Sequence, residues 1–320
     1  MVNKKDSPVS GTQVNVSKET KMDIRQAITD KIIAMLEKGG NEARTRWTKA
    51  AQRGFPRNGK TGDAYRGVNV LILWDEAIER GYLCNVWMTY KQAEGIGAQV
   101  RKGEKAVMCA YFEMVKRKGD EAGQGDSEEG GKAGFSPMCK PFWLFNVAQI
   151  DGLPESFTAP AEVANEFNPI ADAEKLLSAS GATINHGFDG AFYVPSKDQI
   201  CLPARERFTS PENYYATALH ELTHWTGHES RLNRQFSKRF GDDSYAFEEL
   251  VAELGAAFVA GHVGFVDTTI ENHAAYVENW LSVLKNDKTA IFTASKQASL
   301  AYDFILEKAG MKTAREARAE

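Results

Sequence analysis

Residues 218–225 read ALHELTHW, and this stretch decides what kind of fold the second half of the chain adopts. His220 and His224 are four residues apart, so on a helix they lie on one face, one turn from each other. Two imidazoles in that arrangement can bind one zinc ion at about 2.0–2.1 Å. Glu221 follows the first histidine directly, so it projects beside the metal and can take a proton from a water molecule there. The stretch predicts a zinc site of the HExxH type, with His220 and His224 as ligands and Glu221 as general base.

The flanking residues predict where the helix of this motif begins and ends. Ser210 or Thr209 can cap its N-terminus, and Pro211 suits its first turn. Gly227 provides an exit at the other end. The predicted helix therefore covers about residues 210–228.

A third ligand is expected from a second helix. Residues 247–258 (FEELVAELGAAF) carry three acids in an apolar pattern, and such acids need a metal or another partner. Glu249 and Glu253 are four residues apart on one face, whereas Glu248 points about 100° away. We assign Glu249 as the ligand and Glu253 as the acceptor of a hydrogen bond from a ligand histidine. His228 is the alternative ligand, and a solvated acidic face is the alternative role for these acids.

The hydrophobic pattern predicts an α+β chain with two domains. The front domain is expected over residues 22–153, after a disordered lead-in at 1–21. It should contain helices at 22–38, 68–80 and 89–94 and strands at 106–115 and 141–150. The two strands are expected to pair in a small antiparallel sheet, joined by a mobile, glycine-rich acidic loop at 119–136.

The second domain is expected over residues 170–320, after a linker at 154–169. It should be mostly helical, with a small sheet in the hairpin-like stretch 182–202. The predicted helices cover about 170–178, 210–228, 244–263, 272–285 and 287–309.

Composition and charge limit the kinds of molecule that the chain is expected to bind. The 320-residue chain carries a net charge of −4, yet residues 21–118 hold 19 Lys and Arg against 11 Asp and Glu, which favours a polyanion partner. No run of 18 apolar residues occurs, so we expect no membrane span, and the polar N-terminus does not resemble a secretion signal. The four cysteines form no CxxC pair, so free thiols in a reducing cytoplasm are expected.

The basic front interleaves cations with aromatic residues. Residues 44–67 (RTRWTKAAQRGFPRNGKTGDAYRG) contain seven Lys and Arg among Trp47, Phe55 and Tyr65, and a second cluster follows at 87–112. Cations neutralise phosphates and aromatic faces stack on unpaired bases, so the pattern suits single-stranded nucleic acid better than duplex. Core aromatics under solvated lysines are the alternative.

Residues 54–61 (GFPRNGKT) also satisfy the phosphate-loop expression GxxxxGK[ST]. That loop requires a buried strand before it and a helix beginning at its Lys-Thr pair. A polar run precedes this stretch and a Gly-Asp turn follows it, so we reject a nucleotide site.

The metal motifs resemble those of the glutamate-type zincins, with Thr223 as a polar departure from their pattern. The whole chain resembles the ArdC family of plasmid antirestriction proteins, whose N-terminal domain also occurs in TraC-type primases. The front match rests on Trp47, Pro56-Arg57-Asn58, Thr61-Gly62, Tyr65 to Asn69, Trp87 to Gln92, Gly97, Val100 to Glu104 and Asn146-Val147. The back match rests on His220 to Gly227 and Glu248 to Glu253.

The resemblance implies a single-stranded-DNA-binding domain joined to a zincin-like metallopeptidase domain that holds one zinc or another divalent ion. Such a protein would protect incoming plasmid DNA from host restriction during conjugation and could cleave a host protein of the restriction machinery. Candidate DNA contacts are Trp47, Arg57, Asn58, Tyr65, Arg66, Asn69, Tyr90, Lys91, Arg101 and Lys102, and Tyr193 is a candidate for placing substrate. Two alternatives stay open: a zincin domain that is structural or a docking module, and a DNA-processing enzyme without peptidase activity.

Overall fold

The computed structural model describes residues 22–39, 54–116, 135–154, 157, 169–234, 243–264 and 274–311. Trp47, the predicted lead-in at 1–21, and most of the predicted loop at 119–136 and linker at 154–169 lie outside these residues. The two predicted domain boundaries therefore stay predictions.

The front half is an α+β unit built on a four-stranded sheet. Its elements are α1 (Ile24–Gly39), β1 (Arg57–Asn58), α3 (Val68–Glu79), β2 (Val86–Met88), α4 (Tyr90–Glu94), β3 (Gln99–Val100), β4 (Val107–Lys116), β5 (Phe135–Asn146) and β6 (Ile150–Asp151). The sheet has the order β1-β2-β5-β4, and β3 pairs with β6 separately. β4 and β5 pair antiparallel along ten positions, as the predicted hairpin requires, whereas β1 adds a parallel pair beside β2.

Local sequence explains where these elements begin. Thr89 caps α4, because its hydroxyl accepts from the Gln92 amide while the Gln92 side chain accepts from the Thr89 amide. No helix begins at Lys60-Thr61, where β1 instead ends in a turn whose amides donate to the Asn58 side chain. This stretch therefore lacks the helix that a phosphate loop requires at its Lys-Thr pair.

The second half is mostly helical. Its elements are α6 (Pro169–Ala179), β7 (Thr183–His186), β8 (Phe192–Val194), β9 (Gln199–Leu202), α7 (Pro211–Thr226), α8 (Asp243–Val263), α9 (Ala274–Asn286) and α10 (Ala290–Lys308). All five predicted helices are confirmed within a few residues. The small sheet has the order β7-β9-β8, in which β8 and β9 form a hairpin and β7 runs parallel to β9.

The two metal-motif helices, α7 and α8, approach each other closely at one point. A Cβ on Gly255 of α8 would lie 2.5 Å from Cγ2 of Thr223 on α7, so only glycine fits there. Thr223 is fully buried, and its hydroxyl donates to the Leu219 carbonyl of its own helix at 2.9 Å. The polar departure from the zincin pattern is therefore a small buried side chain, and the second helix comes near it because Gly255 has no side chain.

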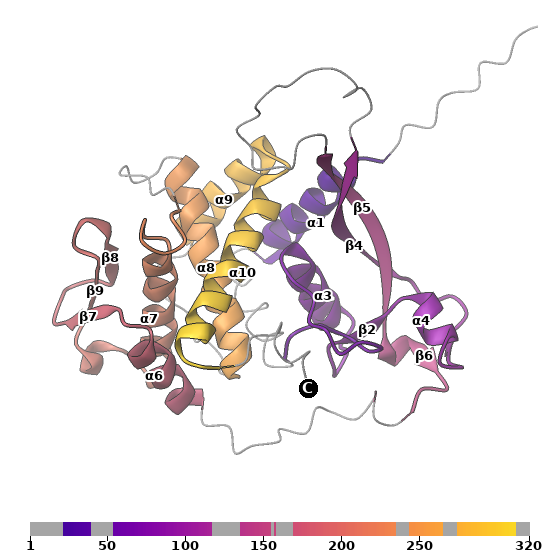
Figure 1. Cartoon of the computed structure of the whole chain (residues 1–320), viewed down its shortest axis with the longest axis horizontal. Helices are drawn as coiled ribbons and strands as arrows, with labels where there is room; N and C mark the ends of the chain where they lie inside the picture. The colour runs from indigo at the N-terminus through magenta and orange to yellow at the C-terminus, as the bar shows by residue number, and fades with distance from the viewer. Residues whose placement is uncertain are drawn as a thin grey trace, which may run out of the picture.

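One hydrophobic core runs through both halves. The Phe55 ring of the front half lies 5.9 Å from the Phe258 ring of α8 and 5.3 Å from the Tyr302 ring of α10. Trp74 of α3 also meets Phe258, with ring centroids 5.9 Å apart. In Figure 1, α10 lies between the α7–α8 pair and the front half, and it contacts α3, α7 and α8. We call Phe55, Trp74, Phe258 and Tyr302 the aromatic junction.

None of the helices that the structure describes has both the length and the apolar character needed to cross a membrane.

Candidate metal centre and DNA-binding residues

The predicted helix of the metal motif forms because its ends are well capped. Ser210 is the N-cap and accepts a hydrogen bond from the Asn213 amide at 3.2 Å, with Pro211 in the first turn. Gly227 is the C-cap. From Tyr214 onward all but one residue of this helix is buried, so its polar motif residues face protein rather than water.

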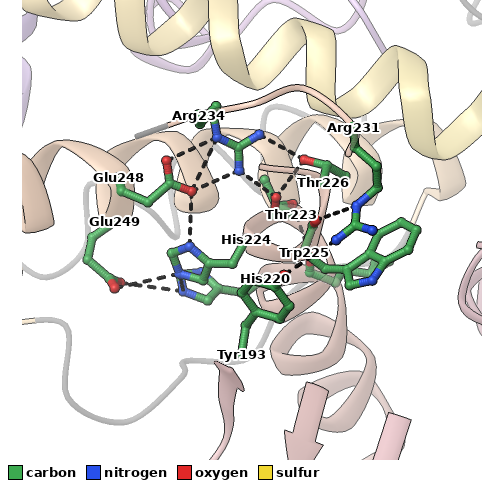
Figure 2. A network of polar contacts seen from close by, with 11 residues as sticks. Tyr193, His220, Thr223, His224, Trp225, Thr226, Arg231, Arg234, Glu248 and Glu249 are labelled. Carbon is green, nitrogen blue, oxygen red and sulfur yellow. Dashed lines mark hydrogen bonds and ion pairs between the residues drawn. The ribbon is translucent and has the colours of Figure 1, made fainter. Parts of the chain in front are cut away.

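The three predicted ligands converge on one point. Nε2 of His220 lies 3.2 Å from Nε2 of His224. The Glu249 carboxylate spans both rings, with Oε2 3.5 Å from His220 Nε2 and Oε1 3.5 Å from His224 Nε2. Figure 2 shows the two imidazoles and this carboxylate pointing toward one another from α7 and α8. Among the described residues, these three form the group whose donor atoms could hold a metal ion.

The spacing of these donor atoms fits a small divalent cation. Donors bound tetrahedrally at about 2.0–2.1 Å lie about 3.3–3.4 Å from one another. The observed separations of 3.2 and 3.5 Å match that edge length. Two neutral imidazoles and one carboxylate are also the donor set that zinc enzymes with an open fourth position use.

Glu253 lies behind His220, as the sequence predicts. Its Oε1 is 3.4 Å from Nδ1 of His220, the ring nitrogen that faces away from the donor triangle. Burial alone would lower the pKa of His220, but the carboxylates of Glu253, Glu249 and Glu221 outweigh it and raise this pKa to about 9. Without a metal, His220 is therefore protonated at neutral pH, and a metal has to displace that proton to bind.

Glu248 takes the matching position behind His224, which the sequence analysis did not predict. Its Oε1 lies 3.2 Å from Nδ1 of His224. Burial would raise the pKa of Glu248, but hydrogen bonds from His224 and Arg234 outweigh burial and hold it below the usual value. Consecutive residues of α8, Glu248 and Glu249, thus contact the two nitrogens of one imidazole. Their side chains leave the helix about 100° apart, and this angle places the two carboxylates on either side of the His224 ring. It does not turn Glu248 away from the metal centre.

Arg234 has no counterpart in the sequence analysis either. It follows α7 in a segment without helical or strand periodicity, where one arginine among several basic residues resembles any surface cation. Its side chain is nonetheless only 4% exposed and pairs with Glu248. The only indication in the sequence was that α8 carries a third acid, Glu248, which needs a partner if it is buried.

Glu221 projects beside the donor triangle. It is 7% exposed, and burial raises its pKa above the ordinary value of a glutamate. The Tyr193 backbone amide donates a hydrogen bond to its carboxylate. Tyr193 lies on β8, so the edge strand of the small sheet contacts the proposed base directly.

A second arginine fixes this edge strand. Arg231 donates to Asp198 Oδ2 at 2.9 Å, and Asp198 accepts from the Tyr193 hydroxyl at 2.8 Å. The Arg231 guanidinium also stacks on the Trp225 ring, 3.7 Å from its centroid. These contacts connect the end of α7 with the turn after β8 and hold Tyr193 next to the site.

The alternative ligand, His228, is turned elsewhere. Its Nδ1 lies 2.8 Å from the Ser230 hydroxyl on a partly exposed loop after α7, outside the donor triangle.

Several of the candidate DNA contacts are engaged inside the protein. Asn58 bonds to the Tyr65 hydroxyl and the Gln92 side chain, and Asn69 bonds in both directions to the Ala110 backbone. Tyr65 itself is largely covered, and its ring stacks on Phe142. These three side chains therefore stabilise the front half through contacts within the protein.

Two candidate arginines are paired with acids. Arg66 forms a bidentate ion pair with Asp303 of α10, which connects the two halves of the chain. Arg101 pairs with Asp151 and Glu104.

The remaining candidates in the described region are exposed. Arg57, Lys91 and Lys102 present their charges to solvent, and the Tyr90 ring is 45% exposed. Lys91 and Tyr90 are neighbours at the start of α4, and Gln99 of β3 donates to the Tyr90 hydroxyl at 3.1 Å. A cation and an open aromatic face thus occur together beside β3.

Comparison with known families matches two separate stretches of the chain. Residues 22–145 match the profile of the N-terminal domain of the anti-restriction factor ArdC, and residues 171–297 match that of a zincin-like metallopeptidase.

Similar proteins extend over both halves. The chain is 39% identical over 300 residues to a DNA primase TraC of Escherichia coli, covering 90% of this chain but only 27% of that protein. It therefore spans about a quarter of the length of that primase. It is 35% identical to the protein y4eC of Sinorhizobium fredii, with 90% of this chain and 92% of that protein covered.

Solved structures of one protein also match. The metal-free crystal structure of the antirestriction protein ArdC from plasmid R388 has a TM-score of 0.74 and 38% identity, covering 91% of this chain and all of that chain. Its Mn(II)-bound form matches with a TM-score of 0.71 and 38% identity over 90% of this chain and 98% of that chain.

Proposed function

This chain belongs to the ArdC family of antirestriction proteins, and from this premise we propose that it binds single-stranded DNA and carries a zinc peptidase centre. Its role would be to protect incoming plasmid DNA from host restriction during conjugation. The four free cysteines agree with work in a reducing cytoplasm.

The convergence of His220, His224 and Glu249 supports the metal centre most directly. We propose zinc as the ion, although Mn(II) binds the R388 relative. A zinc ion would act as a Lewis acid at a substrate carbonyl and lower the pKa of water. The chain itself provides two imidazoles and one carboxylate, all three of them buried.

Glu221 would provide the proton transfer. Burial raises the pKa of its carboxyl, which makes the carboxylate a stronger base, and we propose that it takes a proton from water and returns it to a leaving amine. The substrate we propose is a peptide bond in a host protein of the restriction machinery.

The front half would bind single-stranded DNA through its exposed cations and rings. Arg57, Lys91 and Lys102 can neutralise phosphates, and the open Tyr90 face can stack on an unpaired base. The engaged residues Asn58, Asn69 and Tyr65 would keep this surface in shape.

The Glu221→Gln variant tests the catalytic part of this proposal. The amide is isosteric and cannot accept a proton, so the metal content should stay unchanged while metal-dependent cleavage falls by roughly 10²–10⁴-fold. The readouts are elemental analysis, protein cleavage in a host lysate and protection of transferred DNA from restriction.

A non-catalytic role is the second candidate, because the aromatic junction packs the zincin half tightly against the front half. In that case the zincin half is a structural or docking module, and Glu221→Gln protein would protect DNA as well as the unmodified protein does.

A further inference from the structure

Arg234 completes a row of buried charges that ends at the ligand His224 (Figure 2). Its Nε donates to Glu248 Oε2 at 3.0 Å, and its Nη2 donates to Oε1 at 2.8 Å. The same Oε1 lies 3.2 Å from His224 Nδ1. The Arg234 and Glu248 side chains are only 4% and 6% exposed, so neither charge is satisfied by water.

The arginine is itself fixed to the helix that carries the histidines. Its Nη1 donates to the Thr226 hydroxyl at 2.8 Å, and its Nη2 donates to the Thr223 carbonyl at 2.6 Å. Both acceptors belong to the last turns of α7. Arg234 therefore joins a carboxylate of α8 to the end of α7, and both of its terminal nitrogens are engaged.

We propose that Arg234 is a positioning residue for the metal centre, acting through Glu248. This inference rests on the proposed metal site. The forked guanidinium fixes the plane of the carboxylate, which a single contact would leave free to rotate. An oriented carboxylate keeps the proton of His224 on Nδ1, so that the lone pair of Nε2 points toward His220 and Glu249.

Arg231 provides a matched comparison within the same short segment. Its side chain is 10% exposed and is also paired with an acid, Asp198. Its other contacts are the carbonyl and ring of Trp225 and the hydroxyls of Tyr193 and Ser230, and none of these contacts is with the three proposed ligands. A variant of Arg231 therefore shows the general effect of losing a paired arginine, and a variant of Arg234 shows the effect on the metal centre.

The test measures the dissociation constant of Zn²⁺ by competition with a chromophoric chelator, using the full chain. Arg234→Met should weaken zinc binding by about 10- to 100-fold, the range for partners that orient a metal-bound histidine. Arg231→Met should leave the zinc dissociation constant unchanged. Arg234→Lys keeps a charge but loses the fork, so it should lie between Arg234→Met and the unmodified protein.

Two further readouts separate positioning from a general structural role. Arg234→Met combined with Glu248→Gln should weaken zinc binding no more than Glu248→Gln alone, because the arginine acts through that carboxylate. In ¹⁵N NMR spectra, the unmodified metal-free protein at a pH where His224 is neutral should show the proton of His224 on Nδ1, and Arg234→Met should show a mixture of tautomers.

A folded Arg234→Met protein with unchanged zinc affinity, or strictly additive losses in the double variant, would overturn the inference. If Arg234→Met does not fold, Arg234→Lys decides the question by the same measurement. If the unmodified protein binds no zinc, the proposed metal centre itself fails, which is a different outcome.

Discussion

The predicted residues of the metal centre converge on one point, whereas those of the front surface are spread over different contacts. In the metal centre, donor atoms of His220, His224 and Glu249 meet within 3.5 Å of one another, so few of their polar atoms are available for other contacts. On the front, Asn58, Arg66, Asn69 and Arg101 are engaged with protein atoms, and only some candidates face solvent. A residue pattern locates a metal site better than a DNA-binding surface, because ligation needs fixed geometry and DNA binding needs free groups.

The sharpest test of this contrast removes one ligand. Structural zinc sites in zinc-finger peptides bind with about 10–16 kcal/mol, or roughly 2.5–4 kcal/mol for each of four donors, and we take the same scale for this site. His224→Asn should therefore raise the zinc dissociation constant by roughly several hundredfold. His228→Asn, one turn further along, is the matched control and should change nothing. Equal losses in both variants would mean that the donor triangle is wrongly assigned.

The pH dependence of zinc binding tests the electrostatics of the same site. Because the pKa of His220 is raised to about 9, zinc has to displace a proton at pH 7. The apparent affinity should rise by up to about tenfold per pH unit from pH 7 to 9 and then level off. Without metal, the stabilising effect of this proton is complete below about pH 6.5 and is lost as the pH rises through 9. A zinc affinity that is the same at pH 7 and pH 8.5 would contradict the raised pKa.

Gly255→Ala tests the close approach of α7 and α8. The new Cβ would lie 2.5 Å from the Thr223 methyl group, so the helices have to separate, at about 1–3 kcal/mol in the free energy of unfolding. Zinc affinity should fall as well, because Glu249 moves with α8. Urea unfolding measures the first effect, and adding Thr223→Ser, which removes the methyl group, should restore part of both losses. Alanine normally favours a helix over glycine, so a stabilised variant would show that the contact is not tight.

The smallest effects are expected on the front surface. Lys91→Ala and Lys102→Ala should each weaken single-stranded DNA binding a few-fold and lower the slope of log affinity against log salt by about 0.7. Fluorescence anisotropy with a labelled oligonucleotide at several salt concentrations measures both. Arg66→Ala should leave the slope unchanged, since its charge is paired with Asp303. If Arg66→Ala also lowers the slope, that ion pair opens when DNA binds, and the front surface is larger than the free protein shows.

Much of the fold could be predicted because its signals are local. The apolar spacing predicted the helices, Ser210 and Gly227 predicted the ends of α7, and two apolar runs predicted that β4 and β5 pair. The parallel pairing of β7 with β9 and of β1 with β2 could not be predicted, since it joins segments separated by intervening chain.

The candidate site could likewise be predicted only where its signals are local in the sequence. Spacing of four residues identified both histidines and placed Glu249 and Glu253 on one face. The roles of Glu248 and Arg234 depend on how α8 crosses α7 and on the course of the loop after α7, and neither is written in a periodic pattern. For the same reason the sequence could not show that Asn69 bonds to the β4 backbone.

The aromatic junction has a consequence for how such a protein can be divided. Phe258 lies nine residues after Glu249 on α8, about 13 Å along the helix axis, and its ring meets Phe55 and Trp74 of the other half. A chain cut between residues 154 and 169 would leave these rings facing water on both pieces, so we expect each piece alone to aggregate. The two segments that separate family profiles recognise would then be inherited, expressed and lost together.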